Sequence, residues 1–114
     1  MPDPRFDELI HPSTRLAIVA LLASTDWADF AYVRDRLEMS DSALSKQFTT
    51  LEEAGYLSVD RPLENHRRRV RVALTDAGRA AFDGHVAALQ AVIAGAPVSA
   101  GAPAPQPAVQ RAAV

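Results

Sequence analysis

A cluster of basic residues is the part of this sequence best suited to bind a ligand. Arginines and a histidine crowd one short segment: Arg61, His66, Arg67, Arg68, Arg69 and Arg71. Guanidinium groups so close together repel one another unless an anion compensates their charge, and they suit phosphate groups geometrically. The cluster therefore predicts contact with a nucleic-acid backbone, with one arginine reaching into a minor groove. A solvated charged hairpin or a solubilising edge strand is the alternative interpretation.

The spacing of the arginines indicates which of them would face the nucleic acid. Successive side chains of a strand point to opposite faces, so Arg69 and Arg71 would share one face and Arg68 the other. We expect Arg67, Arg69 and Arg71 to matter more for DNA than Arg68, with His66 as a neighbouring contact.

A second group of residues has the types and spacing needed to approach bases. At about 100° per residue, Leu44, Phe48 and Leu51 point to one side of a helix. The opposite side carries small polar residues and one cation: Ser42, Ser45, Lys46 and Thr49. Such side chains can approach base edges and phosphates without steric conflict. An ordinary amphipathic helix also has a polar outer face, but no acid occurs from Ser42 to Leu51 in this acidic chain. Glu53, at the far end, would repel phosphate, so the N-terminal half of the helix should make the contacts.

The overall charge alone would not predict a nucleic-acid partner. The chain has 14 acidic residues against 12 lysines and arginines, a formal net charge of −2. A local basic patch matters more than the total for a polyanionic partner, and the mild acidity predicts binding that depends steeply on salt. The main alternative is a protein-interaction domain that keeps the fold without binding DNA. The net acidity favours it and the arginine cluster argues against it.

Length and composition predict one small cytoplasmic domain. The chain has 114 residues, 48% of them hydrophobic, and no cysteine, which excludes disulfides and thiolate metal sites. The polar start, Met1–Ile10, does not resemble a signal peptide. The longest apolar run, Leu16–Ala23, is too short to span a bilayer, so we expect no membrane partner.

Helices that would position these residues are predicted from capping signals and apolar spacing. The first three are expected at residues 12–23, 30–38 and 41–54. Asp29 and Ser40 are expected to cap the second and third helices, and Gly55 to end the third in a left-handed conformation. A last helix is expected from the N-cap Thr75 to about Ile93.

A hairpin is predicted between the third and the last helix. Residues 56–59 form one strand, 61–67 a turn-rich loop, and Arg68–Leu74 the returning strand. The last helix carries a coiled-coil-like apolar stripe: Phe82, Val86, Leu89 and Ile93. This stripe predicts a homodimer, whose two recognition helices would lie about one DNA turn apart, roughly 34 Å.

The predicted fold is mainly α with a small β-hairpin (α+β), a winged helix-turn-helix with a C-terminal dimerisation helix. We expect an N-terminal lead-in at 1–10, the DNA-binding domain at 11–75 and the dimerisation helix at 76–94. The segment 95–114 is rich in Ala and Pro and is expected to be a disordered tail.

Three motifs in this order resemble MarR-type and ArsR-type transcriptional regulators. They are HPSTRLAIVALL at 11–22, LSKQFTTLEEAGYL at 44–57 and LTDAGR at 74–79, and the resemblance covers roughly Leu9–Ile93. It is strongest to the compact, single-domain MarR-like subgroup. The resemblance implies a homodimer on a pseudo-palindromic operator, with the recognition helix in the major groove and the wing on the flank. Gln47-Phe48 departs from the His-Leu pair that is frequent in these families, which changes packing more than polarity.

No metal, cofactor or catalytic site is expected. Metal-sensing relatives use cysteine or clustered histidine and acid ligands, whereas His11, His66 and His85 fall in different predicted elements. We expect His11 at a helix start and His85 on the outer side of the last helix. Motifs of nucleophilic, metal-dependent and nucleotide-binding enzymes are lacking, so the sequence does not predict an enzyme.

Aromatic residues could serve a small effector. For Trp27 and Tyr32 we favour packing in the core or at an interface over lining an effector pocket. Tyr56 is expected in the core. The identity of any effector does not follow from the sequence.

Overall fold

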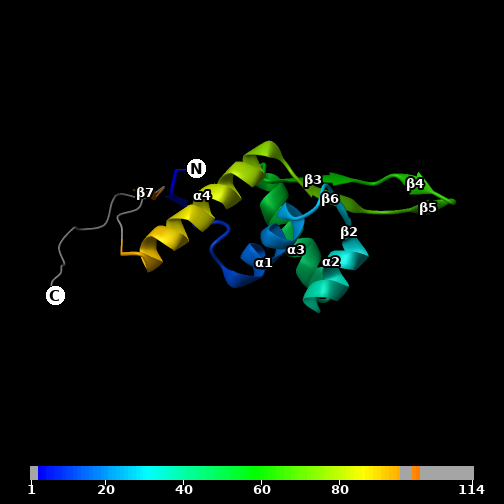
Figure 1. Cartoon of the computed structure of the whole chain (residues 1–114). Helices are drawn as coiled ribbons and strands as arrows, with labels where there is room; N and C mark the ends of the chain where they lie inside the picture. The colour runs from blue at the N-terminus through cyan, green and yellow to red at the C-terminus, as the bar shows by residue number, and fades with distance from the viewer. Residues whose placement is uncertain (1–2, 96–98, 101–114) are drawn as a thin grey trace.

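The computed structural model describes residues 3–95 and 99–100 of the chain. Its helices are α1 (Ser13–Ala23), α2 (Phe30–Leu37), α3 (Asp41–Glu53) and α4 (Asp76–Ile93). Its strands are β1 (Arg5–Phe6), β2 (Ala28–Asp29), β3 (Leu57–Asp60), β4 (Leu63–Glu64), β5 (Arg67–Arg68), β6 (Arg71–Leu74) and β7 (Ser99–Ala100). In Figure 1, α1, α2 and α3 gather at the centre, and α4 and the β4–β5 hairpin extend from them in opposite directions. The predicted α+β class is confirmed.

The central sheet contains a strand that the sequence analysis did not predict. β2 pairs antiparallel with β6, and β6 pairs antiparallel with β3, so the order is β2-β6-β3. The predicted return strand is interrupted at Arg69 and Val70; at this point the Val70 carbonyl accepts a hydrogen bond from Phe30 N–H (2.8 Å) at the start of α2. Beyond this break, β4 and β5 pair with each other and form, with their turn, what we call the outer wing (residues 63–68).

The core lies between the first three helices and the central sheet. Its buried members come from all of these elements and from the N-terminal segment: Ile10, Ile18, Val19, Leu22, Ala28, Val33, Leu44, Phe48, Leu51, Leu57, Val72 and Leu74. The predicted inner face of the third helix is confirmed, since Leu44, Phe48 and Leu51 are all buried. Burying a large apolar side chain stabilises the fold by about 1.5–3 kcal/mol. This face therefore fixes the orientation of α3.

Helix ends follow the predicted caps, with one exception. The Ser40 hydroxyl accepts a hydrogen bond from Ala43 N–H (3.1 Å), and the Thr75 hydroxyl accepts one from Gly78 N–H (3.0 Å). Gly55 has the expected left-handed conformation, with φ of +81°. Asp29 occupies the N-cap position of α2 but makes no side-chain cap hydrogen bond. Its carboxylate bonds arginines of the hairpin instead, as described below.

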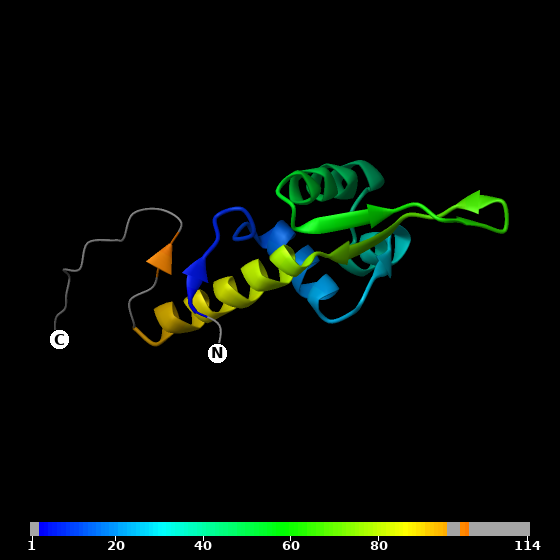
Figure 2. The ribbon, with the colours of Figure 1, turned by 90° about the horizontal axis from the view of Figure 1, so that it is seen from above.

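The N-terminal segment is part of the folded domain. β1 lies against α4, and Ile10 is completely buried in the core. Figure 2 shows this segment, in blue, crossing α4 before it turns towards α1. β7 pairs in parallel with β1, within the segment that the sequence predicts to be a disordered tail. Except for Gly95 and this strand, that predicted tail lies outside the described residues.

The prediction that His85 lies on the outer side of the last helix is wrong. His85 is 0% exposed, because the N-terminal segment covers this face of α4. Its Nδ1 accepts a hydrogen bond from Asp7 N–H (3.0 Å), and its Nε2 lies 3.3 Å from Nδ1 of His11. His11 and His85 are therefore not isolated from each other. No group of three potential metal ligands gathers among the described residues.

The predicted apolar stripe of α4 is partly buried at its start and exposed at its end. Phe82 packs against the core, whereas Ile93 at the other end is 86% exposed and its neighbour Val92 is 55% exposed. The end of α4 therefore leaves apolar surface uncovered in the single chain. None of the described helices has both the length and the hydropathy needed to cross a membrane.

Candidate nucleic-acid interface

The outer face of α3 is polar and exposed, as the sequence predicts. Ser42, Ser45, Lys46 and Thr49 are all exposed. The Thr49 hydroxyl donates a hydrogen bond to the Ser45 carbonyl (3.0 Å), which leaves its oxygen free to accept one. Lys46 makes no ion pair within the described part of the chain. This face thus presents a cation and small hydroxyl groups outwards.

The turn before α3 fixes the angle between α2 and α3. Glu38 adopts a left-handed conformation (φ 55°), which reverses the chain after α2. Arg34 donates a hydrogen bond to its neighbour Asp35 (2.8 Å) and, across the turn, one to Asp41 at the start of α3 (2.9 Å), which joins the two helices. The hydrogen bond from Arg34 lowers the pKa of the Asp35 carboxyl. These ion pairs lie at the surface, so they contribute little to the stability of the fold.

The inner side of α3 is joined to α1 through the residues that depart from the family pattern. Gln47 accepts a hydrogen bond from Arg15 (3.0 Å), whose guanidinium also bonds the Leu9 carbonyl (2.6 Å). Phe48 packs edge-on against Phe30, with ring centroids 5.5 Å apart. Gln47 and Phe48 therefore help to hold α3 in position, and neither belongs to its outer face.

The tip of the outer wing is a tight two-residue turn. Asn65 and His66 have positive φ angles of 51° and 62°, and Glu64 pairs with Arg67 across the turn. Positive φ at both central residues is the pattern of a type I′ hairpin turn. His66 and Arg67 are exposed there, and Arg67 has no ion pair among the described residues. Residues 61–67, predicted as one turn-rich loop, thus contain β4 and a two-residue turn whose Asn65 is a recognised turn signal.

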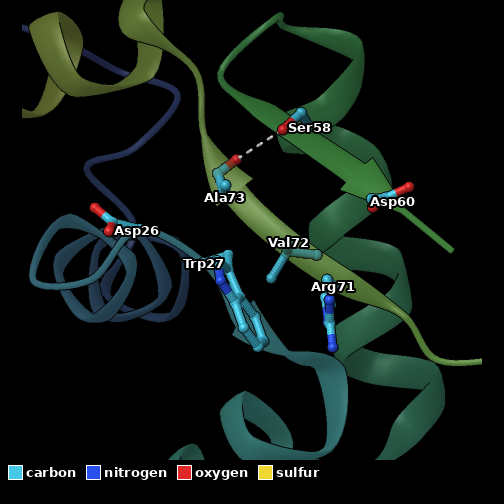
Figure 3. Close-up of a pocket in the computed structure, with 7 residues that line it drawn as sticks. All are labelled: Asp26, Trp27, Ser58, Asp60, Arg71, Val72 and Ala73. Carbon is cyan, nitrogen blue, oxygen red and sulfur yellow. Dashed lines mark hydrogen bonds between the residues drawn. The ribbon is translucent and has the colours of Figure 1, made fainter. Parts of the chain in front are cut away.

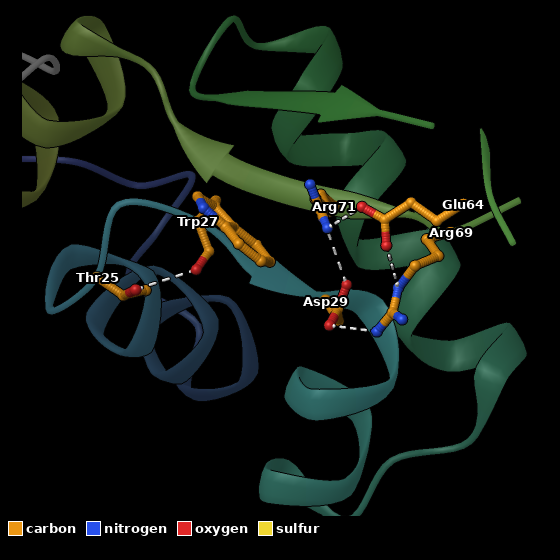
Figure 4. Close-up of polar contacts among 6 residues, drawn as sticks. All are labelled: Thr25, Trp27, Asp29, Glu64, Arg69 and Arg71. Atoms are coloured by element: carbon orange, nitrogen blue, oxygen red, sulfur yellow. Dashed lines mark hydrogen bonds and ion pairs between the residues drawn. The ribbon is translucent and has the colours of Figure 1, made fainter. Parts of the chain in front are cut away.

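The base of the wing is neutralised by acids of the same chain. Arg69 donates a hydrogen bond to Asp29 (2.8 Å), and Arg71 donates one to Glu64 (2.6 Å). Longer contacts of 3.8 Å join Arg69 to Glu64 and Arg71 to Asp29 (Figure 4). The hydrogen bond from Arg69 to Asp29 raises the pKa of the guanidinium. The compensating anion that the arginine cluster requires is thus supplied, at these two positions, by Asp29 and Glu64.

The predicted wing residues consequently fall into two groups. His66 and Arg67 lie exposed at the tip, whereas Arg69 and Arg71 belong to a network at the base. Sequence reasoning missed Asp29 and Glu64 as members of this network. Asp29 precedes Arg69 by 40 residues, and no periodic pattern connects them.

Trp27 and Tyr32 lie at the surface of the chain, which rules out the core half of the predicted packing in the core or at an interface; packing at an interface stays a prediction. Trp27 is 47% exposed and Tyr32 52% exposed. The Arg71 guanidinium stacks on the Trp27 ring at 4.2 Å from its centroid. Open hollows of about 290 and 370 Å³ flank the indole; Figure 3 shows the smaller one, with Arg71 beside the ring. Both aromatic residues line the larger hollow, and its use as an effector pocket stays the alternative prediction.

Tyr56 is only partly buried, at the edge of the core. Its hydroxyl donates a hydrogen bond to Asp7 Oδ2 (2.6 Å), which ties the start of the hairpin to the N-terminal segment. Burial, and secondly this hydrogen bond, raise the pKa of Tyr56 to about 12. The core prediction for Tyr56 is correct for its ring, and the hydroxyl has a separate role.

Comparison with known proteins places this geometry in a family. The family model described as a winged helix DNA-binding domain matches residues 14–93. A transcriptional regulator homologue from Pyrococcus horikoshii OT3 superimposes with a TM-score of 0.74 at 25% identity, over 78% of this chain and 88% of that one. YusO from Bacillus subtilis, with a TM-score of 0.63 at 23% identity over 69% of this chain and 55% of that one, shares the fold. An uncharacterised protein from Methanocaldococcus jannaschii is 25% identical over 79 residues, 69% of this chain and 86% of that protein.

Proposed function

The chain belongs to the family of winged helix DNA-binding domains, and from this we propose that it is a transcriptional regulator that binds duplex DNA as a homodimer. The similarity to the Pyrococcus horikoshii transcriptional regulator homologue supports the regulatory role. The observation that carries the proposal is the outer face of α3, which is exposed, polar and free of acids from Ser42 to Thr49.

The outer face of α3 suits the major groove. That groove is about 12 Å wide and admits a helix, whose side chains then meet base edges. Lys46 would contact phosphate or a guanine edge, while the hydroxyls of Ser42, Ser45 and Thr49 would bond bases or phosphates. Glu53 lies at the other end of the helix and would repel phosphate, so the N-terminal part of α3 enters the groove.

The outer wing would contact the DNA beside the recognition helix. Its tip, with His66 and Arg67, extends away from the body of the protein (Figure 2). Arg67 is the residue of this tip that would bind a phosphate or enter the minor groove. Arg69 and Arg71 contribute to binding through the position of the wing, because their charges are already paired with Asp29 and Glu64.

The homodimer would form through α4. Its C-terminal end carries the exposed side chains Val92 and Ile93, and a second copy would bury this apolar surface. The dimer would present two α3 helices to successive major grooves of a pseudo-palindromic site, about 34 Å apart.

The test is a fluorescence-anisotropy titration of duplex DNA over a salt series. We expect wild-type affinity to fall steeply as salt rises. Lys46→Ala and Arg67→Ala should each weaken binding and reduce the salt slope by about 1. Arg5→Gln is the matched control, because it removes the same charge from an exposed site in β1, which lies against α4 and not against the wing.

Two results would contradict the proposal. A wild-type protein that does not bind DNA at low salt would favour the protein-interaction alternative. Equal losses in Arg5→Gln and in the two interface variants would mean that total charge, and not this surface, determines binding.

A further inference from the structure

We propose that Asp29 and Glu64 are positioning residues for DNA binding. Together with Arg69 and Arg71 they form a wing clasp, which holds the outer wing at a fixed angle to α2 and α3. This inference rests on the function proposed above, and it concerns two acids that DNA itself would repel.

The clasp spans a break in the backbone pairing. Residue pairing in the central sheet ends at Asp60 opposite Arg71, and pairing in the outer wing begins at Leu63 opposite Arg68. Between them, Arg69 N–H donates a hydrogen bond to the Pro62 carbonyl (3.0 Å). An isolated two-stranded hairpin is marginally stable in water, so side-chain contacts must help to set its direction. The clasp lies at the point where such contacts are needed.

The four residues of the clasp come from both sides of this break. Glu64 belongs to the outer wing, Arg69 to the break, Arg71 to the central sheet and Asp29 to the strand that leads into α2. Acids and arginines alternate around the group, so each guanidinium lies between two carboxylates (Figure 4). The formal charges sum to zero. The arrangement therefore links the wing to the start of α2 without adding net charge at the base.

The Asp29–Arg71 half of the clasp is directed inwards, whereas Arg69 and Glu64 are partly exposed. Asp29 Oδ1 and Arg71 Nε are buried, lack a hydrogen-bond partner and lie 3.8 Å from each other. The Trp27 ring covers the Arg71 guanidinium at 4.2 Å from its centroid. Arg71 is thus held by an aromatic face and two carboxylates, and moving it to a phosphate would break all three contacts.

This geometry predicts a result opposite to that of simple electrostatics. Removing a carboxylate near DNA should raise affinity, because it removes repulsion of phosphate. If the clasp positions the wing, Glu64→Gln and Asp29→Asn should instead lower affinity, since Arg67 would no longer be held beside the DNA. Glu53→Gln is the matched control: it removes the same charge from an exposed position on α3 that belongs to no ion pair in the described structure.

Two readouts test the proposal on the full chain. The first is affinity for duplex DNA: Glu64→Gln and Asp29→Asn should bind about tenfold more weakly than wild type, within the range of couplings between distinct sites. Glu53→Gln should bind as well as wild type or better. The second readout needs no DNA. Trp27 is the single tryptophan of the chain and stacks on Arg71, so its emission should shift to the red when either acid is removed.

The outcomes separate this inference from the proposed function. Tighter DNA binding by Glu64→Gln, matching Glu53→Gln, with unchanged Trp27 emission would overturn the clasp. Equally, a failure of wild type to bind DNA would overturn the proposed function, and with it the role of the acids in DNA binding. In that case the shift in Trp27 emission would still decide whether the clasp holds the wing. Far-UV circular dichroism of each variant excludes loss of folding as the cause.

Discussion

His11 and His85, 74 residues apart in the chain, face each other with Nδ1 of His11 3.3 Å from Nε2 of His85. His85 Nδ1 already accepts a hydrogen bond from Asp7 N–H, so the proton of its neutral ring must lie on Nε2. That proton points at His11 Nδ1, which must then be an acceptor. Phe6 packs against both rings, at 4.6 and 4.8 Å between centroids. The contact therefore requires His85 to be neutral.

Acidification should detach this part of the N-terminal segment. Burial, and secondly the charge of protonated His11, lower the pKa of His85 below its usual 6.5, although Asp7 and Glu8 act in the opposite direction. The unfolded chain therefore binds a proton more readily than the folded one, so the stabilisation is complete above pH 6.5. It should be lost as the pH falls from there through the lowered pKa. Thermal unfolding between about pH 5 and 8 measures this loss, in the range where a histidine titrates.

Two variants isolate the histidine pair. His85→Asn keeps an acceptor near Asp7 N–H but does not titrate, so the melting temperature should change less between neutral and mildly acidic pH. His66→Gln removes an exposed histidine at the wing tip and should leave the pH dependence as in wild type. An unchanged acid-induced loss in His85→Asn would refute this assignment.

Two glycines of α4 should respond oppositely to alanine. A Cβ on Gly78 would lie 2.2 Å from the Tyr56 carbonyl oxygen, whereas one on Gly84 would meet the Arg5 side chain and the Asp3 carbonyl no closer than 3.4 Å. We expect Gly78→Ala to destabilise the protein by about 1–3 kcal/mol, as overpacking does. Gly84→Ala should be neutral or stabilising by up to about 1 kcal/mol, because alanine favours a helix. Urea unfolding compares the stability of the two variants. Equal changes in stability would contradict the close approach of Gly78 to the Tyr56 carbonyl.

Removing the Thr75 hydroxyl should lower the free energy of unfolding more than removing a threonine hydroxyl on a helix surface. It accepts from Gly78 N–H and donates to the Gly55 carbonyl (2.6 Å), joining the end of α3 to the start of α4. Thr75→Val should therefore cost about 1–2 kcal/mol, as the loss of a helix cap does. Thr50→Val, which removes only a hydrogen bond to the Lys46 carbonyl, is the control and should cost less. If urea unfolding shows the same loss of stability in Thr75→Val and Thr50→Val, the two hydrogen bonds of the Thr75 hydroxyl add nothing beyond an ordinary surface hydrogen bond.

The exposed end of α4 should control the oligomeric state. Ile93→Asp places a charge where the proposed dimer buries an apolar side chain, so sedimentation should show monomer at micromolar concentration. Ala80→Asp introduces the same charge at an exposed position of α4 on the side away from the Phe82–Ile93 stripe, and this variant should remain a dimer. A wild-type monomer at this concentration would rule out the dimer, and dimeric Ile93→Asp would place the interface elsewhere.

Local sequence signals determined the helices and the outer face of α3. Ser40, Gly55 and Thr75 end or begin helices through contacts within a few residues, and such contacts depend on residue type alone. The spacing of Leu44, Phe48 and Leu51 likewise defined the buried side of α3, because a helix has a fixed period. The exposure of Lys46 followed from the same period.

The tertiary structure decided which distant segments cover which faces. Periodicity placed His85 on α4 but could not reveal that residues near Asp7 would bury it. Similarly, alternation grouped Arg69 with Arg71, but only the fold brought Asp29 to them and neutralised the wing base. Long-range charge pairing and burial depend on how complete elements pack, and this information is not contained in the spacing of neighbouring residues.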